Sequence, residues 1–412
     1  MATSSPSVST PGWRAEPART RAPRRRGGWW TYALAAPLLA FLAATFLIPV
    51  ALMLSRGVTE RELPAVWPAT AAALRQWDGS GLPRDALART LAADMRRSRV
   101  KGGINLVANR LNADQVGSRS LVYGTADRLV AGARGDHVAD LARIDPRWGE
   151  RSTWAMLRHA AGPATSFYLW AALDRRVDAD RHVVPVPSEQ AVFVDILART
   201  FEISFTVALL CVLLGYPLAY LLATIPKRWA NPLLILVLLP FWTSALVRTT
   251  AWVVLLQTNG LVNDTLLALG LIDRPLELIY NRLGVYVALT HVLLPFFVLP
   301  LYGVMKGISP VEMRAAGSLG ANPLQAFLRV YLPQTLPGVA AGALIVFTLA
   351  LGYYITPALV GGGGDQMISS MIAFYTDQSL NWGMAAALSL LLLAPLVLLL
   401  FFGRVLARTV PA

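Results

Sequence analysis

Cysteine and histidine are scarce in this sequence of 412 residues, which contains one cysteine, Cys211, and four histidines. A single cysteine excludes a disulfide or a cysteine-based metal site within the chain. Because Cys211 lies inside an apolar run, we interpret it as a small packed side chain. His137, His159 and His182 do not have the spacing of zinc ligands. No metal and no other cofactor is therefore expected.

Several signatures of catalysis and nucleotide binding are also absent. The sequence has no GxxxxGKS/T, no HExxH, no Gly-x-Ser-x-Gly and no GxGxxG between a strand and a helix. The glycine run 361–364 has the composition of either an anion-binding nest or a reverse turn, and a turn is favoured. The chain is therefore not expected to be an enzyme. Any uphill transport by it would take energy from a partner or from an ion gradient.

Charged residues make up only 15% of the chain, whereas hydrophobic residues make up 55%, and the mean hydropathy is +0.50. This composition predicts an all-α integral membrane protein with a soluble portion. The net charge of +13 comes from 37 Lys and Arg against 24 Asp and Glu. The basic residues gather in the N-terminal tail and one long loop without interleaved aromatic residues. This distribution argues against nucleic acid and favours a lipid bilayer as the partner.

The N-terminus combines a basic tail with an apolar run. Residues 1–28 are rich in Ser, Thr, Pro and Arg and are expected to form a disordered basic tail in the cytoplasm. The following run, 29–55, is too long for a signal peptide and has no small-residue cleavage site, so we interpret it as the first transmembrane helix. The cluster Arg24–Arg26 would hold the N-terminus inside, with Trp29 and Trp30 at the interface.

Residues 56–196 contain no apolar span and are long enough for a small domain. Helical periodicity over 85–100, with Leu87, Leu91 and Met95 near one face, predicts a mainly helical extracytoplasmic insert. Further helices are expected at 140–143, 152–161 and 165–174, and turns at 79–81, 102–103, 145–146 and 183–187.

Residues 197–408 contain five further apolar runs, at 197–223, 233–256, 285–304, 339–360 and 384–402. With the first helix they predict six transmembrane helices and both termini in the cytoplasm. The inside loops then carry Lys227, Arg228, Lys306, Arg314 and Arg329, in agreement with the positive-inside rule. A short interfacial helix is expected at 266–272, and residues 361–382 are expected to form a loop.

Ionisable residues inside these runs are informative because burying them in a membrane is costly. Arg248 lies near the middle of its run, Glu202 near the start of another, and His291 inside a third. Arg248 would either pair with a neighbouring helix or line a wet pathway, whereas a structural role is favoured for His291. Four prolines predict bends around a cavity: Pro217, Pro240, Pro295 and Pro300.

A mostly polar segment, Glu312–Gly338, interrupts the apolar runs on the expected cytoplasmic side. Its pattern predicts a short helix, a turn at 320–323, a second helix at 324–331 and a break at Pro333. The small side chains of Ala315–Ala316 permit close approach of another surface, and the glycine at 320 permits a tight turn. These features are typical of a helix that docks into a groove of a partner.

A set of residues in the cytoplasmic loop 305–337 has a defined spacing: Arg314, Ala315, Ala316, Gly320, Val330, Leu332 and Pro333. This spacing resembles the cytoplasmic loop of ABC importer permeases, which reads Glu-Ala-Ala, three residues, Gly, nine residues, then Ile-x-Leu-Pro. Arg314 stands where that family usually has Glu. Glu312 is two residues earlier and would point another way on a helix. The resemblance implies that this loop, together with Glu312, couples the chain to an ATPase.

Other strings narrow the resemblance, over 197–407, to permeases of the spermidine/putrescine type. They include LGYPLAY at 214–220, LPFWTS at 239–244, VRT at 247–249, NGLVN at 259–263 and TPALVGG at 356–362. The resemblance implies a permease subunit of an ATP-driven importer in the inner membrane, with 197–408 as its permease core. Its partners would be a second permease, an ABC ATPase dimer and a periplasmic solute-binding protein.

A second sequence difference from that family bears on the class of solute. Polyamine-type permeases often carry Gly-Glu-Phe where this chain has Gly352-Tyr353-Tyr354. A cation in a low-dielectric cavity needs carboxylates or aromatic faces, and this chain offers aromatic faces. The expected solute-pathway residues are Trp242, Thr243, Arg248, Tyr353 and Tyr354. Polyamine is the first choice of solute, and opines, other amino-acid derivatives or an organic anion near Arg248 are the alternatives.

Two other classes of function compete with an importer permease. A stand-alone secondary transporter or channel would show intramembrane acids in relay or an inverted repeat, and the sequence shows neither. A membrane-anchored enzyme or sensor would use 56–196 as its active domain. An enzyme would need a catalytic constellation there, which is missing.

Overall fold

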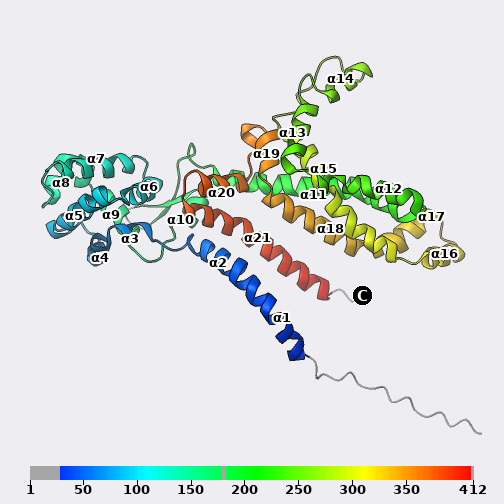
Figure 1. The fold of residues 1–412 in the computed structure, drawn as a ribbon, viewed down its shortest axis with the longest axis horizontal. Helices are drawn as coiled ribbons and strands as arrows, with labels where there is room; N and C mark the ends of the chain where they lie inside the picture. The colour runs from blue at the N-terminus through cyan, green and yellow to red at the C-terminus, as the bar shows by residue number, and fades with distance from the viewer. Residues whose placement is uncertain (1–27, 179–181, 410–412) are drawn as a thin grey trace, which may run out of the picture. The chain divides into compact units, whose positions relative to one another are not determined.

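Residues 28–178 and 182–409 are described by the computed structural model of the chain (Figure 1), with side chains over 35–178 and 182–401. The basic tail predicted at 1–28 lies outside these residues apart from Gly28, as does the Arg24–Arg26 cluster. The side chains of Trp29 and Trp30 are not among those described either, so their interfacial position stays a prediction. The described residues divide into two separate units at the boundary between Leu52 and Met53.

The first apolar run is continuously helical. It consists of α1 (Gly28–Leu42), a π-helical turn η1 (Ala43–Leu47) and α2 (Ile48–Ser55). The stretch Ala35–Ser55 is long and apolar enough to cross a membrane, and most of its side chains are exposed. The predicted helix at 29–55 is therefore present, and its role as the first transmembrane span stays a prediction.

The insert between the first two spans is mainly helical, as predicted. The predicted helix at 85–100 corresponds to α5 (Asp85–Lys101), whereas the one at 165–174 is shorter. The other helices are α3 (Glu62–Val66), α4 (Pro68–Gln76), α6 (Ile104–Asp114), α7 (Ser118–Val130), α8 (Val138–Ile144), η2 (Pro146–Gly149), α9 (Arg151–His159) and α10 (Phe167–Ala172).

Three tryptophans fill the hydrophobic core of the insert, and each buried indole N–H has an acceptor. Trp67 donates to Ser98 Oγ at 2.9 Å and Trp148 donates to Thr125 Oγ1 at 2.9 Å. Trp154 donates to the backbone carbonyl of Trp148 at 2.8 Å. Because a buried indole without an acceptor would be costly, these bonds fix how the helices pack.

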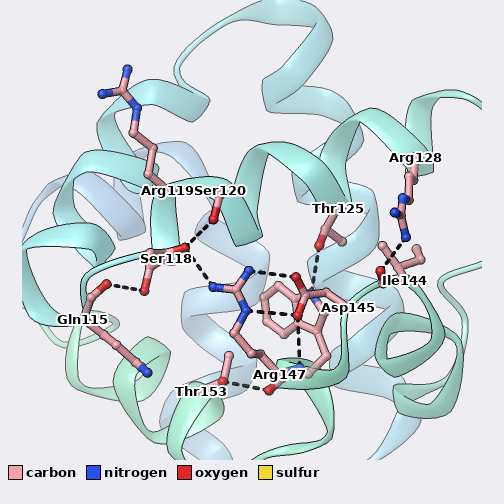
Figure 2. Close-up of polar contacts among 12 residues, drawn as sticks. Gln115, Ser118, Arg119, Ser120, Thr125, Arg128, Ile144, Asp145, Arg147 and Thr153 are labelled. Atoms are coloured by element: carbon pink, nitrogen blue, oxygen red, sulfur yellow. Dashed lines mark hydrogen bonds and ion pairs between the residues drawn. The ribbon is translucent and has the colours of Figure 1, made fainter.

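Figure 2 shows how the turn between α8 and α9 is held. The Arg147 guanidinium makes two bonds to the Asp145 carboxylate, at 2.7 and 3.0 Å, and donates to the carbonyl of Gly117 at 2.9 Å. Its hydrogen bonds hold the pKa of Asp145 below the usual value. The predicted turn at 145–146 therefore opens the 3-10 turn η2.

The predicted turn at 183–187 is wrong for its first three residues. Val183–Pro185 is a strand, β2, which pairs antiparallel with β1 (Arg175–Val177), with Arg176 opposite Val184. The valines have branched side chains that favour extended backbone, and this preference outweighs the turn signal of the nearby prolines.

Three long helices pack side by side in the membrane core: α11 (Phe193–Thr224), α15 (Arg282–Gly307) and α18 (Leu332–Gly352) (Figure 1). Phe297 of α15 lies at their centre and is fully buried. A Cβ atom on Gly215 of α11 would lie 2.5 Å from the Phe297 ring, and one on Gly342 of α18 would lie 2.9 Å from it. Two glycines therefore let both neighbouring helices approach this ring.

The predicted run 233–256 is not one straight helix. It divides into α12 (Lys227–Leu238), the 3-10 turn η3 (Leu239–Trp242) and α13 (Ala245–Leu256), with a bend of 103°. Pro240 lies in the tight turn, and Thr243 and Ser244 are extended, so the helical hydrogen-bond pattern is interrupted. The described residues hold five continuous spans, or six when this bent pair is one span.

The bounds of two other predicted helices also differ from those in the structure. The predicted interfacial helix at 266–272 is α14 (Leu261–Ala268), followed by Gly270 at φ +66°. The predicted run 339–360 is broken after Gly352, and the short α19 (Ile355–Val360) follows.

The predicted loop at 361–382 contains a 3-10 turn, η5 (Gly363–Asp365), and a helix, α20 (Ile368–Asp377), so that prediction is wrong in part. Its apolar residues, beginning with the buried Ile368, pack against α21 (Trp382–Thr409), which contains the last predicted span. Tyr168 of α10 lies directly against Gly383, which joins the insert to this last helix.

Candidate functional site

The polar segment Glu312–Gly338 lies within and after a capped helix, α16 (Pro310–Ser318), at whose start Ser309 Oγ accepts from the Val311 N–H at 3.3 Å. Gly320 follows with φ +89°, and no atom lies within 4 Å of the place where its Cβ would stand. The glycine is therefore needed for the left-handed backbone and not for close packing.

A second helix follows that turn. It consists of α17 (Pro323–Ala326) and a π-helical turn η4 (Phe327–Tyr331), and it runs directly into α18. Asn322 and Gln325 cap its start reciprocally, at 2.8 and 3.2 Å.

The break predicted at Pro333 is wrong. The helix continues through Leu332 and Pro333, and the Leu332 N–H bonds to the Phe327 carbonyl across a π-type turn. Pro333 stands in the first turn of α18, directly after this wider turn, where a ring without an N–H is tolerated.

Most of the expected coupling residues are exposed. Arg314, Ala315, Gly320 and Pro333 are exposed, and Ala316 and Leu332 are half-buried. Glu312 is exposed as well, and its carboxylate accepts from Gln334 Nε2 at 2.5 Å. Leu319, beside the glycine turn, is 89% exposed. The segment thus presents a large apolar side chain and small alanines outward, although the coupling role of these residues stays a prediction.

A cluster of aromatic rings that sequence reasoning missed anchors the segment to α11. The ring centroids of Tyr220 and Tyr331 are 5.5 Å apart, and those of Tyr220 and Phe327 are 5.7 Å apart. The Tyr216 hydroxyl is 3.1 Å from Thr335 Oγ1. The π-turn therefore packs on the C-terminal half of α11, and a movement of either one is expected to displace the other.

A cavity of about 360 Å³ lies where η3, α13, α15 and α18 meet. It is lined by Phe241, Arg248, Val292, Leu293, Phe296, Leu349 and Tyr353. Two of the expected pathway residues, Arg248 and Tyr353, therefore come together. Trp242 is 85% exposed, and neither Thr243 nor Tyr354 lines the cavity.

The sequence did not single out the aromatic pair that forms part of this wall. The rings of Phe241 and Phe296 are tilted, with centroids 4.7 Å apart. Each of the two rings directly follows a proline, Phe241 after Pro240 and Phe296 after Pro295. These prolines were the only local sign in the sequence that the two rings could line a bend.

The two broken segments, α13 and α19, pack against each other beside the cavity. Thr249 Oγ1 and Thr356 Oγ1 are 3.0 Å apart and both side chains are buried. On the next turn Trp252 Nε1 donates to His291 Nδ1 at 3.2 Å, which fits the structural role favoured for this histidine. Irregular backbone within a membrane occurs where it lines a cavity or is covered by protein. Arg248 of α13 lines the cavity, whereas Thr356, Pro357 and Val360 of α19 are buried.

Glu202 has a partner at the end of its span. Its carboxylate accepts two bonds from Arg282 Nη1, at 2.9 and 3.1 Å, and one from the Tyr286 hydroxyl at 3.1 Å. Arg282 also donates to Asp365 at 3.1 Å. Asp365 in turn accepts from the N–H of Gly362 at 3.1 Å, so the glycine run forms a capped turn as expected.

The insert holds a buried ion pair near its junction with the core. Arg110 Nε donates to Glu60 Oε2 at 2.7 Å, and both side chains are almost fully buried. The guanidinium lies 4.0 Å from the ring centroid of Phe167. Burial raises the pKa of the Glu60 carboxyl to about 8, although Arg110 opposes that shift.

Known proteins match the part of the chain that contains the polar segment Glu312–Gly338 and the cavity at Arg248. The family of binding-protein-dependent transport system inner membrane components matches residues 212–410. The spermidine/putrescine transport system permease protein PotB of Escherichia coli (strain K12) is 34% identical over 212 residues, which are 51% of this chain and 77% of that protein. The chain therefore belongs to the family of binding-protein-dependent transport system inner membrane components.

Other members of the binding-protein-dependent permease family match over the same half of the chain. PotB of Salmonella typhimurium (strain SL1344) is 34% identical, over 74% of its length. The inner membrane ABC transporter permease protein YdcU of Escherichia coli (strain K12) is 33% identical over 226 residues, 51% of this chain and 71% of that protein. The insert lies outside the family match.

Among solved structures, a bacterial ABC transporter involved in the import of the acidic polysaccharide alginate has a chain with a TM-score of 0.44 and 20% identity. The match covers 53% of this chain and 80% of that one.

Proposed function

We propose that this protein is the permease subunit of an ATP-driven ABC importer and forms half of the pathway for a small organic solute. The observation that carries the proposal is the cytoplasmic segment, in which α16, the left-handed Gly320 and the aromatic anchor to α11 lie within the family match. A separate ABC ATPase dimer would dock on the loop 312–333 and hydrolyse ATP.

A second permease and a periplasmic solute-binding protein would complete the importer. The N- and C-termini would lie in the cytoplasm of an inner-membrane protein, because the basic residues of the short loops then face inward. Lys306 lies at the same end of the core as Lys227 and Arg228, since its Nζ donates to the carbonyl of Ala223 near the C-terminal end of α11. The PotB relatives transport spermidine and putrescine by their names, so a polyamine or a related small organic solute is proposed for this chain.

Gly320→Trp tests the coupling role. The substitution forces a bulky side chain onto a left-handed backbone at the docking surface, so ATP-driven uptake in proteoliposomes should fall by about tenfold or more. Gly270→Trp is the matched control, because Gly270 also has positive φ (+66°) and open space around its Cβ but lies beyond α14. Equal transport rates for wild type and Gly320→Trp would show that the loop does not couple the chain to an ATPase.

A further inference from the structure

Arg248 brings a positive charge to the cavity between η3, α13, α15 and α18, and the cavity wall supplies nothing to neutralise it. The other residues that line it are aromatic or aliphatic, apart from the Tyr353 hydroxyl. Its Nε atom is buried without a hydrogen-bond partner, and no ion pair to Arg248 occurs among the residues that the structure describes. An unpaired guanidinium inside a membrane segment is costly unless an anion or water meets it.

We propose that this cavity binds the carboxylate group of a small organic solute through Arg248. The assignment rests on the proposed function as an importer permease and, of the solutes proposed there, selects a related small organic solute over a polyamine. A guanidinium presents parallel N–H donors that match the two oxygens of a carboxylate, so one solute group satisfies both its charge and its donors.

The position of Arg248 strengthens this assignment. It lies in the first turn of α13, directly after the extended Thr243 and Ser244. The N-terminal end of a broken membrane helix carries a positive partial charge, which attracts an anion and repels a cation. The backbone and the side chain therefore favour the same sign of ligand.

The remaining wall indicates the rest of the solute. The tilted Phe241–Phe296 pair and the aliphatic residues Val292 and Leu349 suit a short hydrocarbon chain. The faces of the aromatic rings can also bind an amine at the far end of that chain. A cavity of about 360 Å³ admits only a small molecule. A short amino carboxylate fits this wall, whereas a diamine would place a cation beside Arg248.

A matched pair of probes tests the proposal. 4-Aminobutanoate and putrescine have similar chain lengths, with an amine at one end, and differ in carrying a carboxylate or a second amine at the other. Calorimetric titration of the full-length chain in nanodiscs should show binding of 4-aminobutanoate and at least about tenfold weaker binding of putrescine. Arg248→Gln should weaken 4-aminobutanoate by about tenfold or more, and Arg248→Lys should weaken it less.

Arg274→Gln is the control variant, because Arg274 is exposed on the loop after α14. It should leave both affinities unchanged. Putrescine binding as tightly as 4-aminobutanoate, no carboxylate binding by wild type, or 4-aminobutanoate affinity unaffected by Arg248→Gln would each overturn the proposal. Comparison of the two probes on wild type decides the matter even if Arg248→Gln does not fold. Failure of the proposed function would show separately, as absence of a co-purifying ATPase.

Discussion

Single residues of this chain carry charges in places where charge is costly or unexpected. Arg314 stands where permeases of this type usually have glutamate, and it is exposed, as is the neighbouring Ala315. Arg110 and Glu60 are buried together in the insert. The two cases differ in energy, because an exposed charge is screened by water whereas a buried pair depends on every neighbour.

Restoring the family residue at position 314 tests whether charge or backbone shape governs docking. Arg314→Glu should leave the amount of co-purified ATPase within about twofold of wild type, because Gly320 and the capped helices keep the shape of the loop. Arg274→Glu makes the same charge change away from the loop and serves as the control. Loss of the ATPase with Arg314→Glu alone would show that the charge sets the interface.

The buried carboxyl of Glu60 makes the insert sensitive to pH. Its pKa is about 8 in the folded chain and near the ordinary value of 4.5 when unfolded. The folded state therefore binds the proton more tightly, so its contribution to stability is present below about pH 4.5 and is lost as the pH rises towards 8.

Glu60→Gln should flatten this dependence, because an amide does not titrate. Thermal unfolding of the full-length chain, followed by fluorescence of the buried tryptophans between pH 5 and 9, measures it. Glu189→Gln, at an exposed position, should behave as wild type. An unchanged pH slope in Glu60→Gln would show that other groups cause it.

At the scale of elements, small residues decide how closely the long helices approach. A Cβ on Gly342 would lie 2.9 Å from the backbone oxygen of Phe297, which cannot move without shifting α15. By contrast, Gly303 on α15 has open space around it. The same substitution should therefore have opposite effects at these two positions.

Gly342→Ala should lower the stability of the core by roughly 1–3 kcal/mol through overpacking. Gly303→Ala should be neutral or stabilising by roughly 0.5–1 kcal/mol, because alanine is the better helix former. The unfolding midpoints of both variants in one detergent provide the comparison. A Gly342→Ala variant as stable as Gly303→Ala would contradict the close packing around Phe297.

Sequence patterns predicted the spans because a long apolar run is a local signal, and α11, α15 and α21 lie where the runs do. The breaks were harder to predict, because α13 and α19 are stabilised by each other, through pairs such as Thr249 and Thr356 that are far apart in sequence. Pro333 misled for a related reason: the π-turn that accommodates it is held by aromatic contacts with α11.

The candidate sites were predicted to different extents. The coupling loop follows a local spacing, so its helices and the turn at Gly320 could be predicted. The cavity depends on three-dimensional packing, and so Arg248 and Tyr353 were found whereas Phe241 and Phe296 were not. In the insert, the short helices α6 and α7 have mixed composition, and nothing in the local pattern marked Arg110 as buried.

At the scale of the whole molecule, the insert is attached through two adjacent strands of backbone. Thr59 pairs with Ala164 in an isolated bridge, and the Thr165 N–H bonds to the Val58 carbonyl at 2.9 Å. The chain thus enters and leaves the insert at one place, beside α10 and its contact with Gly383. Such an arrangement is typical of an inserted module.

Replacing residues 60–163 with a two-residue Asn-Gly turn should leave the membrane core folded, because the pairing of Thr59 with Ala164 is kept. The shortened protein should elute as a single peak in detergent and retain its ATPase. As a control, the shortened protein that also carries Gly320→Trp should elute as the same single peak but lose ATP-driven uptake. This result would separate folding of the core from coupling to the ATPase. Aggregation of the shortened protein would show that the insert is needed for the core.

If this chain is a permease driven by a separate ATPase, the two proteins should stay together in the membrane. The most direct measurement is affinity purification of the full-length chain from its native membranes, with ATP hydrolysis assayed in the eluate. An ABC ATPase should co-purify with the chain, and ATP hydrolysis should accompany it. A purified chain that supports solute uptake without any ATPase, driven by an ion gradient alone, would contradict this function.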